Sequence, residues 1–148
     1  MDRLLGREIC STANIIRRSM ASLCGHRMVQ KFSGNNGWII GFISKKQEKG
    51  EPAYSKDIEK EFNLRRSTVS MVIKLMESKG LIERKSVEAD GRLKQLILTD
   101  KAKEIDGFVK KDIAETEQKI MQNISKEELE IFFGVMDKIK GNLEDKSR

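Results

Sequence analysis

Two arginines and two hydroxyl residues follow one another in Arg65-Arg66-Ser67-Thr68. Guanidinium groups suit phosphate oxygens or guanine edges, and hydroxyls at the N-terminal end of a helix bind phosphate together with backbone N–H groups. If a helix begins here, its spacing turns a further set of side chains outward, where they would face base edges and thymine methyl groups. This set consists of Ser70, Met71 and Lys74. For Met71 the alternative is an incidental exposed side chain.

An acidic tip that ends in arginine, Glu88-Ala89-Asp90-Gly91-Arg92, separates two short segments that can form strands. The Asp-Gly pair within it is typical of a hairpin turn. Arg92 and Lys94 are then expected at the exposed end of the hairpin. Asp90 is placed to orient Arg92 by a charge-assisted hydrogen bond. The alternative is a solvated tip with an incidental ion pair.

Cysteine and histidine are too few to form a metal site or a catalytic set. Cys10 and Cys24 make no CxxC pair, and His26 is the single histidine. No Gly-rich phosphate loop is present either, so we expect neither an enzyme nor a cofactor. The two thiols fall beside the apolar stripe of a predicted first helix, where a buried cysteine is usually inert.

Whole-chain composition predicts one charged, globular domain. Of 148 residues, 38% are hydrophobic and 35% are charged, and the formal net charge is +6. Residues 1–54 are net +5, residues 55–102 net +3 and residues 103–148 net −2, so phosphate is expected against the first two thirds. No apolar run reaches the ~18 residues of a membrane span, and the first residues lack the apolar segment of a signal peptide. We therefore expect a cytoplasmic protein.

Apolar residues recur at helical spacing from about Arg7 to Lys31, which predicts a long first helix. A turn is expected at Ser33–Gly37, where glycine and asparagine cluster. A second helix is predicted to begin at Trp38 and to end within residues 45–50. It is short and largely apolar, so we expect it to be buried.

Two further helices are predicted to form a helix–turn–helix. Ser55 can cap the first of them. A tight connection at residues 63–65 leads to the next helix, over residues 67–79, which ends at Gly80. The inward-facing residues of the two helices are expected to be Ile58, Phe62, Val69, Val72, Ile73 and Met76.

The hairpin follows, with strands over residues 81–87 and 93–99 and a turn around Asp90-Gly91. Leu96 and Leu98 point to the same face of it. Because an isolated two-stranded hairpin is marginally stable, we expect these two side chains to pack on the fourth helix.

Two helices end the chain, one over residues 100–122 and one that begins at a capping box, Ser125–Glu128. Their apolar stripes have little else to cover, so together with the first helix they predict a dimer. The alternative is packing within one chain. The predicted interface consists of Ile9, Ile16, Ile113, Ile120, Phe132, Phe133, Met136, Ile139 and Leu143.

The order of these elements, and three short motifs, resemble the MarR family of bacterial winged helix–turn–helix transcription regulators over nearly the whole chain. Leu64–Ser70 is similar to the start of the family's recognition helix, and Leu75–Arg84 to its entry to the wing. Asp90-Gly91-Arg92 and Leu98-Thr99 are similar to the wing tip and to the start of the next helix. Each motif alone is weak, but their combined order and spacing are specific.

The resemblance implies a mostly α-helical fold with a small β-hairpin wing. Residues 33–100 would form the DNA-binding lobe, and residues 1–31 and 101–148 the dimerisation helices. Such a homodimer would bind a pseudo-palindromic, double-stranded operator and regulate transcription, as a repressor. Its two recognition helices would enter successive major grooves roughly 34 Å apart.

The hairpin then becomes a wing whose Arg92 enters a narrow minor groove, where the negative potential is enhanced. The expected DNA contacts are Arg65, Arg66, Ser67, Thr68, Ser70, Met71, Lys74, Arg84, Asp90, Arg92 and Lys94.

Members of this family often release DNA when a small aromatic anion binds between the dimer helices and the DNA-binding lobe. The resemblance therefore implies a ligand pocket, and the alternative is that its candidates are ordinary core or surface residues. The candidates are Arg17, His26, Arg27, Trp38 and Tyr54. Some relatives sense oxidants through a first-helix thiol, which makes Cys10 and Cys24 redox candidates. A rival interpretation, a winged-helix module that binds only protein, rests on the acidic C-terminal third and the modest basic density elsewhere.

Overall fold

The structure, a computed structural model, describes the backbone of residues 3–25 and 35–144, and the side chains of residues 3–20 and 36–144. The chain divides into two compact units, Met1–Thr116 and Glu117–Arg148. Each unit is described by itself. The predicted division into a DNA-binding lobe, residues 33–100, and dimerisation helices, residues 1–31 and 101–148, stays a prediction.

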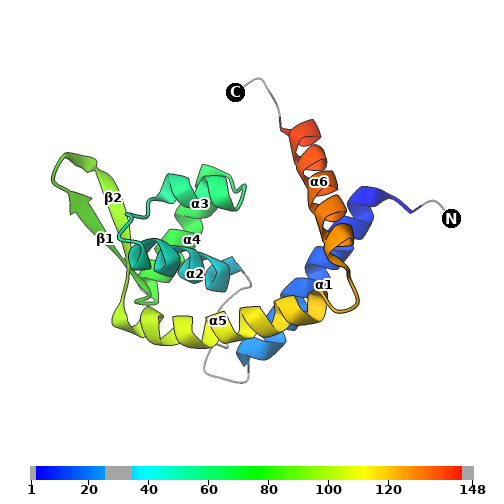
Figure 1. Cartoon of the computed structure of the whole chain (residues 1–148). Helices are drawn as coiled ribbons and strands as arrows, with labels where there is room; N and C mark the ends of the chain where they lie inside the picture. The colour runs from blue at the N-terminus through cyan, green and yellow to red at the C-terminus, as the bar shows by residue number, and fades with distance from the viewer. Residues whose placement is uncertain (1–2, 26–34, 145–148) are drawn as a thin grey trace. The chain divides into compact units, whose positions relative to one another are not determined.

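Six helices and one two-stranded antiparallel sheet make up the described residues, which confirms the predicted fold class (Figure 1). Their order is α1 (Leu5–Gly25), α2 (Asn35–Glu48), α3 (Ser55–Glu61), α4 (Arg66–Ser78), β1 (Ile82–Val87), β2 (Asp90–Leu98), α5 (Asp100–Ile120) and α6 (Lys126–Leu143).

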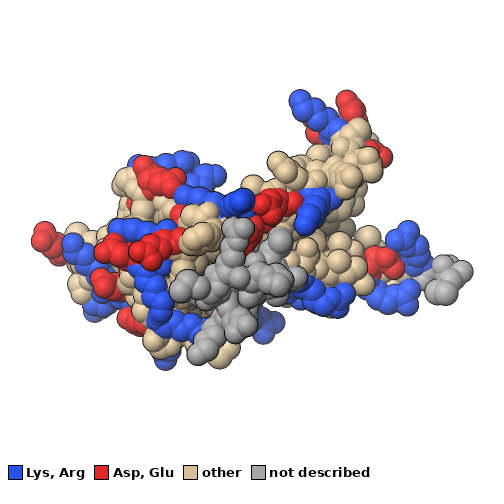
Figure 2. All heavy atoms as spheres, turned by 90° about the horizontal axis from the view of Figure 1, so that it is seen from below, with Lys and Arg blue, Asp and Glu red and all other residues tan. Residues whose placement is uncertain are grey.

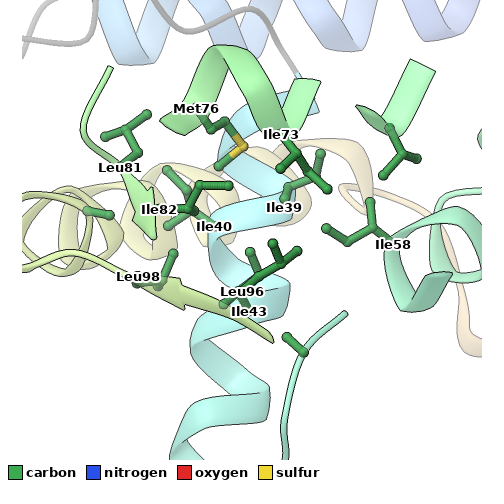
Figure 3. Close-up of a cluster of buried hydrophobic side chains, with 13 residues drawn as sticks. Ile39, Ile40, Ile43, Ile58, Ile73, Met76, Leu81, Ile82, Leu96 and Leu98 are labelled. Carbon is green, nitrogen blue, oxygen red and sulfur yellow. The ribbon is translucent and has the colours of Figure 1, made fainter. Parts of the chain in front are cut away.

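The core of the first unit lies around α2, which is largely apolar as the sequence predicts. Ile39, Ile40 and Ile43 of this helix are fully buried. Figure 3 shows Ile73 and Met76 of α4 on one side of them and Leu96 and Leu98 of β2 on the other. This cluster holds the helix–turn–helix and the hairpin together, because neither could bury its apolar side chains alone.

The helix–turn–helix is confirmed, with one change at its start. Tyr54, not Ser55, occupies the N-cap position of α3, and its backbone N–H donates to Asp57 Oδ2 at 2.8 Å. The short connection to α4 contains Asn63 at a φ of 49°, a left-handed conformation that asparagine tolerates. At the C-terminal end of α4, Gly80 has a φ of 68° and ends the helix as predicted.

The hairpin is confirmed, but its turn lies elsewhere. Glu88 and Ala89 form the turn, and Asp90 already pairs with Val87 as the first residue of β2. The register then shifts between Ser86 and Val87, so that the residues between Asp90 and Lys94 have no partner on β1. The prediction of a turn at Asp90-Gly91 was wrong because this bulge absorbs those residues into the strand.

The base of β2 is attached to α2 and to the loop before α3. Leu98 N–H donates to Gln47 Oε1 of α2 at 3.2 Å, and Leu96 N–H donates to the Ala53 carbonyl at 2.8 Å. Leu96 and Leu98 therefore rest chiefly against α2, whereas α4 lies beside β1. The sequence predicted the buried face of the hairpin but not which helix would cover it.

The second helix begins earlier than the sequence predicts. Asn35, Asn36 and Gly37 belong to α2, so this part of the predicted turn was wrong. Helix formation there buries Asn36, and a side chain at Gly37 would come within 3.3 Å of Val109 on α5. The predicted continuation of the first helix over residues 26–31 lies outside the described residues.

A polar cluster joins α2 to the first half of α5. The buried Asp106 carboxylate accepts from Ser44 Oγ at 2.6 Å and from Lys110 Nζ at 2.9 Å. Lys110 also pairs with Glu48 at 2.6 Å. These opposite charges lower the pKa of Glu48 and raise that of Lys110, chiefly through their mutual hydrogen bond.

In the second unit, α6 begins at the predicted capping box. Ser125 Oγ accepts from Glu128 N–H at 3.2 Å, and Glu128 Oε2 accepts from Ser125 N–H at 2.8 Å. No residue of α6, all of which is described, is buried. Phe132 and Phe133 meet edge to face and are 54% and 59% exposed.

Within the described ranges, no helix combines the length and the apolar character needed to cross a lipid bilayer.

Candidate nucleic-acid interface

The outward face of α4 carries the predicted set of side chains. Val69, Ile73 and Met76 are buried, so helical geometry turns the opposite face to solvent. Met71 is 69% exposed on that face, and Leu75, one turn later, is 43% exposed. The other residues of this predicted interface that are exposed on or next to α4 are Arg65, Arg66, Ser67, Ser70 and Lys74, while Thr68 is half-buried.

We define the wing as β1 and β2. One of its faces is apolar at the base and polar or cationic toward the tip. Ile82, Leu96 and Leu98 are buried at its base. Arg84, Ser86 and Lys94 continue the same face toward the tip, because alternate residues share a side of the sheet. Lys94 Nζ donates to Ser86 Oγ at 2.5 Å across the strands. The same alternation that anchors the wing therefore also points cations toward α3 and α4.

Arg92 is exposed near the tip, as predicted, but Asp90 does not hold its guanidinium group. Asp90 Oδ1 accepts from the backbone N–H of Arg92 at 2.9 Å instead. This contact is typical of aspartate in turns, where a short carboxylate reaches the backbone two residues later. The predicted side-chain contact was wrong, and Asp90 instead stabilises the irregular start of β2. Among the described residues, the Arg92 side chain has no acidic partner.

A groove of about 440 Å³ lies between the helix–turn–helix and the wing. Its lining comes from α3, α4 and both strands and contains five cationic side chains against one acidic side chain, Glu59. We call it the basic groove. The residues that line it are Tyr54, Ser55, Lys56, Glu59, Arg66, Ser70, Ile73, Arg84, Arg92, Leu93 and Lys94.

An ion pair links α4 to the wing. Arg84 Nε donates to Glu77 Oε2 at 3.1 Å, and the two side chains are 33% and 44% exposed. Only one edge of the guanidinium group is engaged in this way, so its remaining N–H groups can meet an anion in the basic groove. Glu77 thereby sets the direction of Arg84.

Charge is mixed on one face of the molecule. On the face drawn in Figure 2, lysine and arginine side chains intermix with aspartate and glutamate. The basic groove is thus a local concentration of positive charge, not a part of a uniformly basic surface.

Three of the five predicted ligand-binding residues lie among the described side chains. Tyr54 lines the basic groove, and Arg17 is an exposed residue of α1 that donates to Asn14 Oδ1 at 2.6 Å. Trp38 is half-buried on α2. His26 and Arg27 lie outside the described residues. A pocket made by these five residues stays a prediction.

The thiols were predicted to lie beside the apolar stripe of the first helix. Cys10 is exposed on α1. The side chain of Cys24 lies outside the described part of the chain. In those described residues no group of three or more histidine, cysteine or carboxylate side chains forms a metal site.

The predicted dimer interface is wholly on helices and largely uncovered. Ile9, Ile16 and Ile113 are half-buried, and Ile120 is 38% exposed. On α6, Met136 and Ile139 are half-buried, whereas Leu143 is 80% exposed, like the two phenylalanines.

Sequence reasoning missed several residues of the basic groove and its surroundings. Lys56 and Glu59 reach the groove from α3, and a helical wheel for that short helix could have identified them. Glu77 and Arg84 meet across a helix end and a strand, where no local spacing rule applies. Leu75 was assigned only to a motif, although helical geometry already placed it next to Met71.

A helix–turn–helix beside a two-stranded wing, with a basic groove between them, defines a winged helix–turn–helix protein. Comparison with known sequences agrees. Residues 33–93 match the sequence model of the MarR family.

Among curated proteins, the chain is similar to YdgJ of Bacillus subtilis (strain 168), an uncharacterised HTH-type transcriptional regulator. The two are 28% identical over 87 residues, which make up 59% of this chain and about half, 53%, of YdgJ.

Two solved structures show the same fold. The S. aureus MepR–DNA complex has a TM-score of 0.82 at 20% identity, and the match covers 96% of this chain and 100% of that one. The transcription regulator MarR from Oenococcus oeni PSU-1 has a TM-score of 0.79 at 23% identity, covering 93% and 99% of the two chains.

Proposed function

We propose that this protein is a dimeric, sequence-specific regulator of transcription that binds double-stranded DNA. Its target would be a pseudo-palindromic operator, at which it represses transcription. The observation that carries the proposal is the exposed face of α4 beside the basic groove. A helix of this kind fits the major groove, and the cations next to it fit the flanking phosphates.

The match of residues 33–93 to the MarR family and a fold shared with MepR, which was solved with DNA, support the proposal. In it, Arg92 enters the minor groove beside the recognition site, because a narrow minor groove attracts a guanidinium group. Arg84 and Lys94 neutralise phosphates between the two grooves. Arg65, Arg66, Ser67 and Thr68 bind phosphate or bases at the start of α4.

The dimer is part of the proposal because one module makes few contacts with DNA. Two modules related by a two-fold axis would read both halves of the operator. The uncovered apolar side chains of α6 supply surface for that association, since exposed phenylalanines are otherwise unfavourable in a soluble unit.

Release by a small aromatic or anionic ligand completes the proposed cycle. Such a ligand must bind the DNA-incompetent arrangement of the two lobes more tightly than the competent one, or it shifts nothing.

Fluorescence anisotropy with a duplex from the gene's own upstream region tests the proposal across a salt series. We expect the logarithm of the affinity to fall linearly with the logarithm of salt concentration, with a slope of about −0.9 for each phosphate neutralised. A protein-binding module with the same fold would show neither the affinity nor the slope, and that result would favour the rival function.

A further inference from the structure

The outward face of α4 beyond Arg66 has few side chains that recognise a base by two parallel hydrogen bonds. After Arg66, the helix, which is described throughout, has no arginine, asparagine or glutamine up to its end at Ser78. Arginine or lysine reads guanine in this way, and asparagine or glutamine reads adenine. Lys74 is therefore the one side chain of this stretch that can read guanine, and Glu77 is paired with Arg84.

Two large apolar side chains stand exposed on the same helix. Met71 is 69% exposed and Leu75 43% exposed, whereas Val69, Ile73 and Met76 are buried. They are four residues apart, so they lie one above the other on the helix surface. We call them the apolar pair. In the free protein this pair contacts water, which is unfavourable unless a partner covers it.

The two flanks of α4 differ in chemistry. Arg66 and Ser70 line the basic groove on the wing side, whereas Met71 and Leu75 do not. Phosphates would thus be held on one flank while the other flank is left for base edges. The thymine 5-methyl group is the apolar feature that a base pair presents in the major groove.

We propose that the apolar pair contacts thymine 5-methyl groups in the major groove of each half-site. This inference rests on the proposed function and names the feature of DNA that α4 recognises. Selectivity then comes from thymines at fixed positions and from the shape of the minor groove under Arg92, beside any guanine contact of Arg66 or Lys74.

The test uses DNA in which deoxyuridine replaces thymidine, because this removes only the methyl group and keeps the base pair. The full chain first selects its strongest site from a randomised duplex pool. Each thymine of that site is then replaced in turn. A methyl group buried on binding contributes about 0.8 kcal/mol, so we expect about a fourfold loss of affinity at each contacted thymine and none elsewhere.

A double-mutant cycle assigns the effect to the side chain. In Met71→Ala and Leu75→Ala, deoxyuridine at the contacted position should cost little further affinity. Ser70→Ala is the matched control on the groove side and should keep the full methyl effect. Both apolar positions are exposed, so the variants should unfold at the same denaturant concentration as the parent.

Three outcomes are distinguishable. Loss of the methyl effect in the apolar variants alone supports the inference. Salt-dependent binding that is insensitive to deoxyuridine at every position, or equally sensitive in all variants, overturns the inference and leaves the proposed function intact. Failure to select any duplex overturns both, and the apolar pair would then belong to a protein interface.

Discussion

Arg84 and Arg92 both line the basic groove, yet their guanidinium groups are held differently. Glu77 engages Arg84, whereas the side chain of Arg92 extends from an irregular strand that Asp90 stabilises only through the backbone. A long, unpaired guanidinium group at a tip can follow a narrow minor groove without first breaking an ion pair. We therefore expect DNA binding by the wing to depend most on Arg92.

Arg92→Ala should weaken operator binding by about tenfold or more, because minor-groove and phosphate contacts of this arginine are lost together. Lys85→Ala is the matched control, since it removes the same charge from the other face of the wing. Anisotropy titrations at one salt concentration measure both. Equal losses in the two variants would mean that only net charge matters and that the wing has no specific contact.

Sequence reasoning succeeded for single residues wherever helical geometry alone decides exposure. Met71, Ser70 and Lys74 are exposed because apolar residues at fixed spacing turn inward. It failed where the backbone departs from regular geometry, as at Asp90, since a bulge cannot be read from hydrophobic alternation.

At the scale of elements, the position of the wing against α4 depends on few contacts. The ion pair between Glu77 and Arg84 is one of them, and it is half-exposed, so its own energy is small. Its effect on geometry is larger, because it fixes the direction of a cation that faces the basic groove.

Glu77→Ala should weaken DNA binding a few-fold, although it removes a negative charge from a surface that meets DNA. The reason is that Arg84 loses its fixed direction. Glu83→Ala, which removes the same charge from the opposite face of β1, should leave affinity unchanged or raise it. If both variants bind more tightly than the parent, Glu77 is only a repulsive charge and has no positioning role.

The polar cluster between α2 and α5 has a definite pH window. The pKa of Glu48 is lowered from its ordinary value of 4.5. The contribution of Glu48 to the free energy of unfolding is therefore present above pH 4.5 and is lost as the pH falls further. The pKa of Lys110 is raised from its ordinary value of 10.5. The contribution of Lys110 to the free energy of unfolding is therefore present below pH 10.5 and is lost as the pH rises further.

Lys110→Met should lower the free energy of unfolding by about 1 kcal/mol near neutral pH, chiefly because the buried Asp106 carboxylate loses a donor. Denaturant unfolding across pH should show this difference shrinking toward both extremes. Lys111→Met is the control, because that neighbour is exposed and has no partner in the described part of the chain. A constant difference at all pH values would indicate lost packing and not lost charge.

Most helices, and the existence of the hairpin, could be predicted, since apolar periodicity and capping residues are local signals. Ser125 and Gly80 are examples, because α6 begins at Ser125 and α4 ends at Gly80 through interactions and backbone geometry within a few residues. Contacts between distant segments could not be predicted in the same way. Asp106 and Ser44 are 62 residues apart, and no local pattern indicates that their side chains meet.

At the scale of the whole molecule, the number of chains per assembly decides whether one operator can be read twice. No residue of α6 is buried within the chain, although its sequence is strongly apolar on one side. Burial against a second copy is the simplest way to remove that surface from water.

Phe133→Glu should convert the dimer to a monomer at micromolar concentration, because a charge would be buried at the interface. Light scattering after size exclusion measures the mass directly. Lys138→Glu, an exposed polar position of the same helix, should leave the mass unchanged. A parent protein that is already monomeric would contradict the two-fold operator.

The single bridge between Ala53 and Leu96 has a consequence for the behaviour of concentrated protein. A two-stranded ribbon normally exposes strand edges on which strands of other molecules can add, and so seeds aggregation. Here the N–H groups of Leu96 and Leu98 are already occupied by the Ala53 carbonyl and the Gln47 amide. The β2 edge at the base of the wing is thereby closed to intermolecular β-sheet growth.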